Sequence, residues 1–239
     1  MRLVERGRLR LLVFPGLEET GLRCAVSTRP LDVKRRDHRD TLAEALGFGP
    51  RQTATVRQVH GAEVLVAGSG DRVRPGDGLL TDEPGRALLL KAADCSLVVV
   101  ADPARRVVGV AHVGWRGAAR GVIGVLARTM ESSYGCDPGS CRAAIGPTIC
   151  AGHYPVGREV VDEFRRARPW AEECVRTRDG RPHFDLAAAN RRLLTECGIP
   201  ETAIEVAGEC TYERTDLLYS YRRDGPETAH HGLAAGWPD

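Results

Sequence analysis

Residues 87–117, ALLLKAADCSLVVVADPARRVVGVAHVGWRG, hold the pattern that decides the fold. They contain three apolar runs of strand length, at 87–91, 97–101 and 107–112, separated by short polar segments. Runs rich in Val and Leu that do not alternate with polar residues are typical of strands buried on both faces. The stretch therefore predicts buried strands at the centre of a layered domain.

Strands and helices are also expected on both sides of this centre. Further strands are predicted at 9–13, 22–27, 53–59, 63–67, 141–145, 204–207, 217–221 and 232–235. Helices are predicted at 40–46, 118–130, 158–166 and 186–196, and a turn at 114–117. Clustered strands with helices between some of them indicate an α+β or mixed α/β layered fold, in one domain that spans residues 1–239.

The composition argues against two classes of partner. The chain has 34 basic and 32 acidic residues, a net charge of +2 and no long basic block, so it does not resemble a nucleic-acid-binding protein. No stretch approaches the roughly 18 apolar residues that span a bilayer, and the start lacks a signal-peptide core. We expect a cytoplasmic protein whose eight cysteines are reduced thiols, metal ligands or nucleophiles.

Three potential metal ligands stand at the ends of predicted strands: His60, Cys95 and His112. Two imidazoles and one thiolate form a three-ligand set for zinc and leave a fourth position for water or substrate, which is typical of catalytic sites. Because the three residues are far apart in the sequence and form no compact motif, their spacing alone leaves open that they are ordinary core residues.

The sequence neighbours of these residues support the interpretation of a metal site. Gly61 and Gly114 flank the two histidines and allow a close backbone approach. Asp94 precedes the cysteine, and Asp77 lies in a Gly-Asp-Gly turn. A carboxylate near zinc could orient a ligand or act as a general base, although Asp77 could equally be a turn residue that binds its own backbone.

Six short motifs occur in order along the chain: QVHG at 58–61, ADC at 93–95, AHVGWRG at 111–117, AIGP at 144–147, CT at 210–211 and SYRRDG at 220–225. Together they resemble the YfiH / laccase-domain family, long labelled polyphenol oxidase and now described as purine nucleoside phosphorylase. The resemblance covers about residues 24–235.

The resemblance implies an α+β fold of stacked mixed β-sheets flanked by helices, similar to a bacterial toxin domain with a Cys–His pair. It assigns zinc to His60, Cys95 and His112. It also implies that adenosine, inosine, guanosine or methylthioadenosine is cleaved with phosphate to the free base and a ribose 1-phosphate, and that adenosine is deaminated. The oligomeric state is not predicted.

Catalytic and binding roles are also expected near these ligands. Asp77 and Cys95 are expected to be catalytic. Arginine pairs well with phosphate oxygens, so Arg29 of the STR segment is expected to bind substrate and take part in catalysis, and Arg116 of the GWRG segment to bind substrate. The chain departs from the family after Arg29, where Pro30 stands in place of a glycine pair.

Three other functions remain open at this stage. Copper redox chemistry is disfavoured, because the chain has no His-x-His pair and neither of its two methionines is near a candidate ligand. A metal-free hydrolase or deamidase would use Cys95 as nucleophile and His112 or His60 as base. A non-catalytic partner protein is the third. An iron–sulfur site is disfavoured, and the cysteines expected only to pack are Cys24, Cys174, Cys197 and Cys210.

Overall fold

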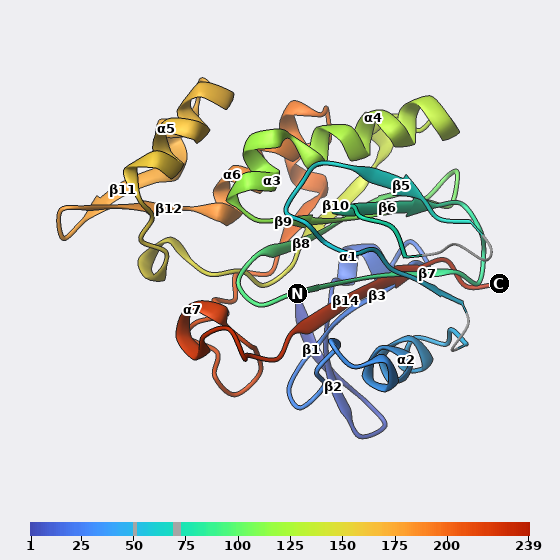
Figure 1. The fold of residues 1–239 in the computed structure, drawn as a ribbon. Helices are drawn as coiled ribbons and strands as arrows, with labels where there is room; N and C mark the ends of the chain where they lie inside the picture. Colours follow the sequence, from blue (N-terminus) through green and yellow to red (C-terminus); the bar gives the residue numbers. More distant parts are fainter. Residues whose placement is uncertain (50–51, 69–72) are drawn as a thin grey trace.

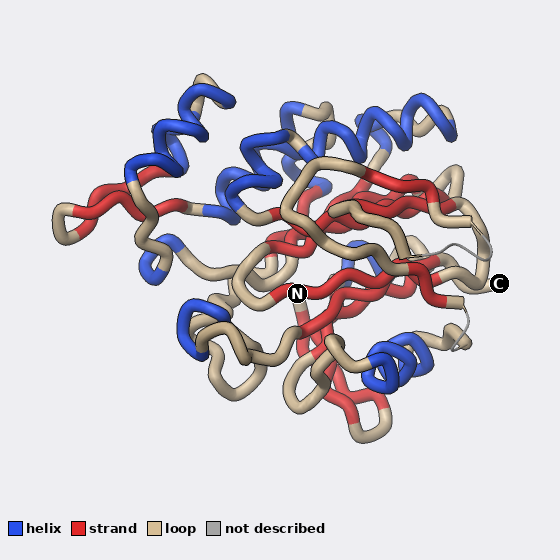
Figure 2. Tube along the Cα trace, in the orientation of Figure 1, coloured by secondary structure: helices blue, strands red, loops and turns tan. Residues whose placement is uncertain are grey.

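The computed structural model describes residues 1–49, 52–68 and 73–239. Two six-stranded sheets stack on each other, and helices cover their outer faces (Figures 1 and 2). The first sheet has the order β1 (Arg2–Arg6), β2 (Leu9–Val13), β3 (Arg23–Ser27), β14 (His231–Gly236), β7 (Ala87–Ala92) and β4 (Thr53–Ala54).

The second sheet contains the other two central strands. Its order is β13 (Ile204–Val206), β10 (Arg142–Ile145), β8 (Ser96–Asp102), β9 (Val107–Val113), β6 (Gly78–Thr81) and β5 (Val64–Val66). β8 pairs with β9 and β10 in antiparallel fashion, whereas β5–β6 and β10–β13 are parallel. In the first sheet β4 pairs with β7 in parallel and the other pairs are antiparallel, so both sheets are mixed, and the expected α+β fold of stacked mixed sheets is confirmed.

The alternation of side chains along the central strands builds three apolar layers. In β8, Leu97 and Val99 face the core between the sheets, while Val98 and Val100 face the helices. β7 follows the same rule, because its even-numbered leucines lie between the sheets and Leu89 faces the outer helix. Successive side chains of a strand point to opposite faces, so a strand buried on both sides must be apolar throughout.

The helices complete the outer layers. The second sheet is covered by α4 (Val122–Tyr134) and α6 (Leu186–Glu196), and the first by α2 (Arg36–Ala45). The remaining helices are α1 (Pro15–Glu18), α3 (Trp115–Arg120), α5 (Arg158–Ala167) and α7 (Tyr221–Asp224), and a hairpin is formed by β11 (Val175–Arg178) and β12 (Arg181–Phe184). Within the described ranges, no helix is long and apolar enough to cross a membrane.

Most of the predicted elements are present, but the single helix expected at 118–130 is divided between α3 and α4, and three other predictions are also wrong. The turn expected at 114–117 begins helix α3, and Gly121, with φ +77°, separates it from α4, because a left-handed residue ends one helix and begins the next. The strand predicted at 217–221 is a turn region leading into α7, and its apolar pattern reflects two leucines buried in the core. The strand predicted at 53–59 ends at Ala54.

Candidate metal centre

Three side chains from distant parts of the chain meet at one edge of the second sheet. His112 lies near the end of β9, opposite Leu97 of β8, and Cys95 lies in the turn from β7 into β8. His60 lies in the loop between β4 and β5. Their ligand atoms all lie within 4.8 Å of one another, and the two imidazole rings meet edge to face. The structure thus brings together the three residues that the resemblance assigned to zinc.

Gly114 leaves the space that the Cys95 thiol occupies. A Cβ atom at position 114 would lie 2.7 Å from the sulfur of Cys95 and 3.7 Å from Cδ2 of His60. The backbone φ of −89° is open to any residue, so the requirement for glycine is one of space. Two imidazoles and a thiolate suit zinc and leave a fourth position open, so these residues could hold that ion.

Asp77 is fully buried and organises two of the three side chains. Its Oδ1 is 2.9 Å from Nδ1 of His112 and accepts the N–H of His60 at 3.0 Å. Its Oδ2 accepts the N–H groups of Val59 and Gly61 at 3.2 and 2.6 Å. A proton on Nδ1 of His112 leaves Nε2 with its lone pair free for a ligand bond. Asp77 therefore orients the ring of His112 and folds the loop of His60.

The Cys95 thiol and the His112 imidazole shift each other's pKa. Burial opposes ionisation of Cys95, but His112 and His60 outweigh it and lower the pKa of the thiol to about 6. Burial also opposes protonation of His112, but Cys95 and Asp77 outweigh it and raise the pKa of the imidazole to about 9. Without a metal, the pair therefore favours a thiolate beside an imidazolium near neutral pH.

Two residues of the site adopt backbone conformations that L-residues rarely take. His60 has φ 58° and Asp94 has φ 98°. Asp94 is held by the Thr211 hydroxyl at 2.6 Å and the Arg222 N–H at 2.7 Å, while its carbonyl accepts the Thr148 hydroxyl at 2.7 Å. Such conformations persist where surrounding contacts enforce them, and they concentrate at functional sites. These bonds fix the backbone immediately before Cys95.

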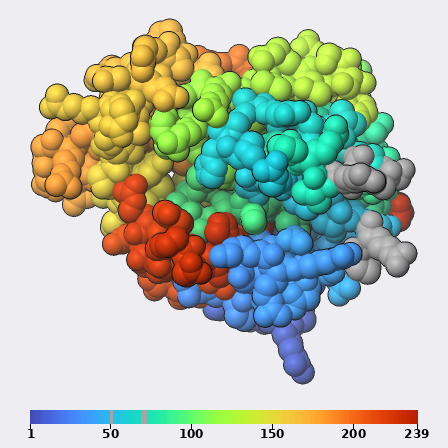
Figure 3. Space-filling model, viewed as in Figure 1, coloured from blue at the N-terminus to red at the C-terminus, as the bar shows by residue number. Residues whose placement is uncertain are grey.

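The three side chains open into a cleft of about 670 Å³. In Figure 3 the red C-terminal segment around α7 borders the hollow, with the green central strands set back behind it. Its described walls carry three cationic groups, Lys91, Arg116 and Arg222, and the aromatic rings of Trp115, Tyr154 and Tyr221. The guanidinium carbon of Arg116 lies 4.4 Å from the ring centroid of Trp115, and that of Arg222 lies 5.1 Å from the ring centroid of Tyr154. The cleft thus offers cationic and aromatic surfaces together.

The two predicted anion contacts lie in different places. Arg116 lines the cleft, as its position in the GWRG segment suggested. Arg29 is absent from the described residues that line it. Its side chain donates to the carbonyl of Leu218 at 3.1 Å and to Asp224 of α7 at 3.2 Å, and it lies over the ring of Tyr219. A role for Arg29 in catalysis stays a prediction, and the observed contacts are those of an anchor for α7.

Sequence reasoning did not identify several residues of the cleft. Arg222 lies in the SYRRDG motif, which could have been recognised as part of the site because it combines two arginines with an aromatic ring. Lys91 is a charged residue inside an apolar strand, which is also a recognisable signal. Tyr154 carries no such signal, because it lies in an irregular segment whose position depends on tertiary packing.

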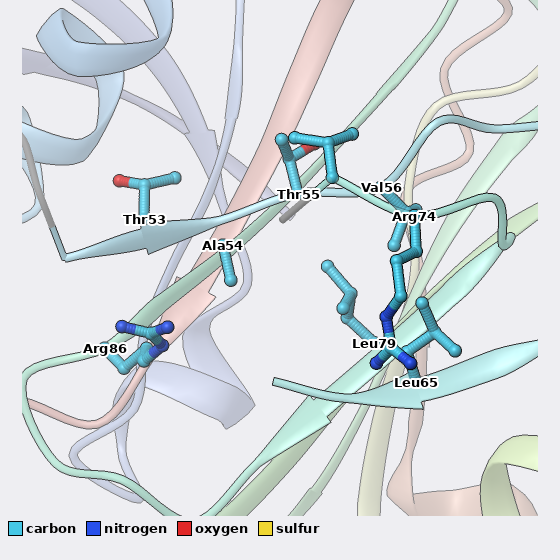
Figure 4. Close-up of a pocket in the computed structure, with 9 residues that line it drawn as sticks. Thr53, Ala54, Thr55, Val56, Leu65, Arg74, Leu79 and Arg86 are labelled. Atoms are coloured by element: carbon cyan, nitrogen blue, oxygen red, sulfur yellow. The ribbon is translucent and has the colours of Figure 1, made fainter. Parts of the chain in front are cut away.

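A second, smaller hollow of about 80 Å³ lies between β4 and the pair β5–β6 (Figure 4). Arg86 and Arg74 extend toward it, and the rest of its described wall is threonine and aliphatic side chains. None of the described residues that line it is a cysteine, histidine or carboxylate. It therefore offers no group for metal binding or acid–base chemistry.

Comparison with known proteins shows the family of this chain. The family model described as multi-copper polyphenol oxidoreductase laccase matches residues 18–236. A purine nucleoside phosphorylase from Deinococcus radiodurans is 41% identical over 204 residues, covering 84% of this chain and 77% of the relative. Adenosine deaminase RL5, from an unknown prokaryotic organism, is 31% identical over 205 residues, covering 79% and 76%.

The fold agrees as well. The crystal structure of YlmD from Geobacillus stearothermophilus superposes with a TM-score of 0.91 at 29% identity, covering 99% of both chains. The crystal structure of the Bacillus licheniformis hypothetical protein YfiH gives a TM-score of 0.89 at 27% identity and covers 97% of this chain and 98% of that one. The chain therefore belongs to the family described as multi-copper polyphenol oxidoreductase laccase, the YfiH / laccase-domain family that its motifs resemble.

Proposed function

We propose that this chain is a zinc-dependent purine nucleoside phosphorylase that also deaminates adenosine. The convergence of His60, Cys95 and His112 at the wall of a cleft with cationic and aromatic surfaces carries the proposal. Relatives named purine nucleoside phosphorylase and adenosine deaminase support both activities. We also propose that the protein acts in the cytoplasm, where its eight cysteines, none of them paired in a disulfide, would stay reduced.

His60, Cys95 and His112 are the proposed zinc ligands. When bound, zinc supplies Lewis-acid character, which activates an electrophilic substrate or a water molecule near neutral pH. Asp77 holds the proton on Nδ1 of His112 and thereby keeps Nε2 available to the metal. The low pKa of Cys95 keeps the thiol ionised, as a zinc ligand must be.

The walls of the cleft are proposed to position the substrates. Trp115 and Tyr154 offer flat surfaces for a purine ring, and Arg116 and Arg222 offer guanidinium groups for phosphate. Arg29 is proposed to act on the cleft through α7, because it pairs with Asp224 of the helix that begins beside Arg222. Adenosine, inosine, guanosine and methylthioadenosine all present the purine and ribose that such a cleft would bind.

Zinc is proposed in preference to copper despite the description of the family. A blue-copper site uses two histidines, a cysteine and a weak axial methionine. Met130 is buried in the core between the second sheet and its helices, and Met1 packs against the core between the sheets. Neither methionine is among the described residues that line the cleft.

A metal-free hydrolase or deamidase is the second candidate, and the charge distribution of the cluster favours it. A thiolate at Cys95 beside an imidazolium at His112 is the arrangement of a cysteine nucleophile with its base. The same thiolate is needed for zinc, so binding of metal separates the two candidates. We expect iodoacetamide to alkylate Cys95 of the metal-free protein with a half-maximal rate near pH 6, and bound zinc to protect it.

The deciding experiment combines metal analysis with product analysis. The full chain is loaded with zinc, desalted, and incubated with adenosine with and without phosphate. We expect adenine only when phosphate is present and inosine in both cases, and we expect Cys95→Ser to lose both products and one zinc per chain. Full turnover by a protein whose Cys95, His60 and His112 hold no metal would overturn the proposal in favour of the cysteine hydrolase.

A further inference from the structure

We propose that Cys150, His153, Cys210 and Glu213 form a second zinc site, with four protein ligands and a structural role. Cys150 and His153 come from the loop after β10, and Cys210 and Glu213 come from the loop after β13. None of the four belongs to the cluster of His60, Cys95 and His112. Their ligand atoms all lie within 4.8 Å of one another. We call this group the second cluster.

The distances within the second cluster match those of a zinc tetrahedron. Nδ1 of His153 lies 3.3 Å from the sulfur of Cys150, 3.8 Å from the sulfur of Cys210 and 3.3 Å from Oε1 of Glu213. Oε1 of Glu213 lies 3.9 Å from the sulfur of Cys150. These are four of the six edges that join four donors around one point.

Zinc–ligand bonds are about 2.3 Å to sulfur, about 2.05 Å to nitrogen and about 2.1 Å to oxygen. A tetrahedron with these bonds has edges of about 3.6 Å for sulfur–nitrogen, about 3.4 Å for nitrogen–oxygen and about 3.6 Å for sulfur–oxygen. The four observed distances differ from these edges by about 0.3 Å or less. These four edges therefore fit one zinc ion with ordinary bond lengths, and the two remaining edges are no longer than 4.8 Å.

The donor set favours zinc and a structural site. Two thiolates, an imidazole and a carboxylate are all zinc ligands, and four protein ligands leave no open position for a substrate. Zinc binds cysteine as the thiolate, so the affinity of such a site increases with pH.

The surroundings of the ligands already hold them in place. The His153 ring stacks on the ring of Tyr212, with centroids 4.4 Å apart and an interplanar angle of 12°. The sulfur of Cys210 accepts the N–H of Cys150 at 3.3 Å, which joins the two loops at the cluster. A hollow of about 110 Å³ is lined by Cys150 and Cys210, and Glu213 is exposed, so an ion can reach the cluster from solvent.

Zinc in the second cluster would tie together the two loops that fix the backbone beside Cys95. Thr148, two residues before Cys150, and Thr211, next to Cys210, both donate to Asp94. Tyr154, the residue after His153, lines the cleft. The second site would therefore stabilise the backbone before Cys95 through Asp94, without contacting a substrate. The proposal of this site does not depend on the proposed activity.

The test is to remove the first cluster and count metal. In the full chain bearing Cys95→Ser, we expect one zinc per chain after loading and desalting, and two in the unaltered chain. With cobalt in place of zinc, we expect Cys95→Ser to show thiolate-to-cobalt absorption about twice as intense as that of the double variant Cys95→Ser/Cys210→Ser, because Cys150 and Cys210 remain in the first and only Cys150 remains in the second.

Variants of the second cluster complete the test. Glu213→Gln, at an exposed position, should weaken zinc binding in the Cys95→Ser background by about 10-fold or more while the protein stays folded. Cys197→Ser removes a half-buried thiol outside both clusters and should leave the zinc count unchanged. Less than one tenth of a zinc per chain in Cys95→Ser, or a disulfide between Cys150 and Cys210 in protein purified under reducing conditions, would overturn the proposal.

Discussion

Replacing Asp77 by asparagine tests whether one buried carboxylate holds both the His60 loop and the His112 ring. Each carboxylate oxygen accepts two hydrogen bonds, Oδ1 from His60 and His112 and Oδ2 from Val59 and Gly61. An asparagine amide keeps one oxygen, so two of the four donors lose their acceptor whichever way the amide is turned. An unsatisfied buried donor costs about 1–3 kcal/mol, so we expect the metal-free protein to lose about 2–6 kcal/mol of unfolding free energy.

Zinc binding should fall as well, because one orientation of the amide leaves Nδ1 of His112 without its acceptor, and the other releases the N–H groups of Val59 and Gly61 that hold the His60 loop. Groups that orient a ligand in this way are worth about 10–100-fold in metal affinity. The measurements are urea unfolding of the metal-free protein and competition for zinc with a chelator.

Asp102→Asn is the matched control for Asp77→Asn. Asp102 is also fully buried, but its two backbone donors, Ala104 and Arg105, share Oδ1 at 3.0 and 3.1 Å, so an amide can keep both bonds. We expect it to cost about 1 kcal/mol or less and to leave the zinc affinity unchanged. If Asp77→Asn matches Asp102→Asn in both measurements, the role assigned to Asp77 is wrong.

Three further predictions follow from particular contacts. Gly114→Ala should displace the Cys95 thiol and lower zinc affinity by about 10-fold or more by chelator competition, whereas Gly124→Ala, whose Cβ would meet only the flexible end of an arginine, should not. Arg222→Met should raise the KM for phosphate by about 10-fold or more and leave adenosine deamination unchanged; equal losses in both assays would contradict this role. Burial and the neighbouring imidazole lower the pKa of His231 from 6.5 to about 3, so the unfolded chain binds its proton first and stability falls as the pH drops below about 6.5. The unfolding free energy of His231→Leu, measured in urea relative to that of the unaltered chain, should therefore rise by about 2 kcal/mol from pH 7.5 to pH 5. A difference that does not change with pH would show that the pKa of His231 is not lowered.

The central strands could be predicted because their sequence is apolar on both faces. In β8 the run 97–101 supplies side chains to two different cores at once, and no amphipathic helix or half-exposed strand has that composition. The segment 114–117 was predicted incorrectly because its two glycines are typical of a turn. Its helical state depends on packing, since Gly117 and Ala118 of α3 are buried against neighbouring elements.

The cysteines of the second cluster could not be predicted as ligands from the sequence either. Cys210 was expected only to pack, and its sequence neighbours contain no second ligand at a zinc-binding spacing except Glu213. Cys150 and His153, three residues apart, are a weak motif on their own. They meet Cys210 because Thr148 and Cys210 form a bridge between two loops that are about 60 residues apart, which no local pattern encodes.

The sequence by itself determined the apolar strands, the kinds of donor that this protein can offer to a metal, and, through its motifs, the family to which it belongs. Only the tertiary structure decided which donors meet, that Asp77 orients His112, and that Arg29 anchors α7 while Arg222 faces the cleft. The physical reason is that backbone preference and ligand chemistry are local properties of a residue, whereas the distance between donors depends on strand register and the stacking of two sheets.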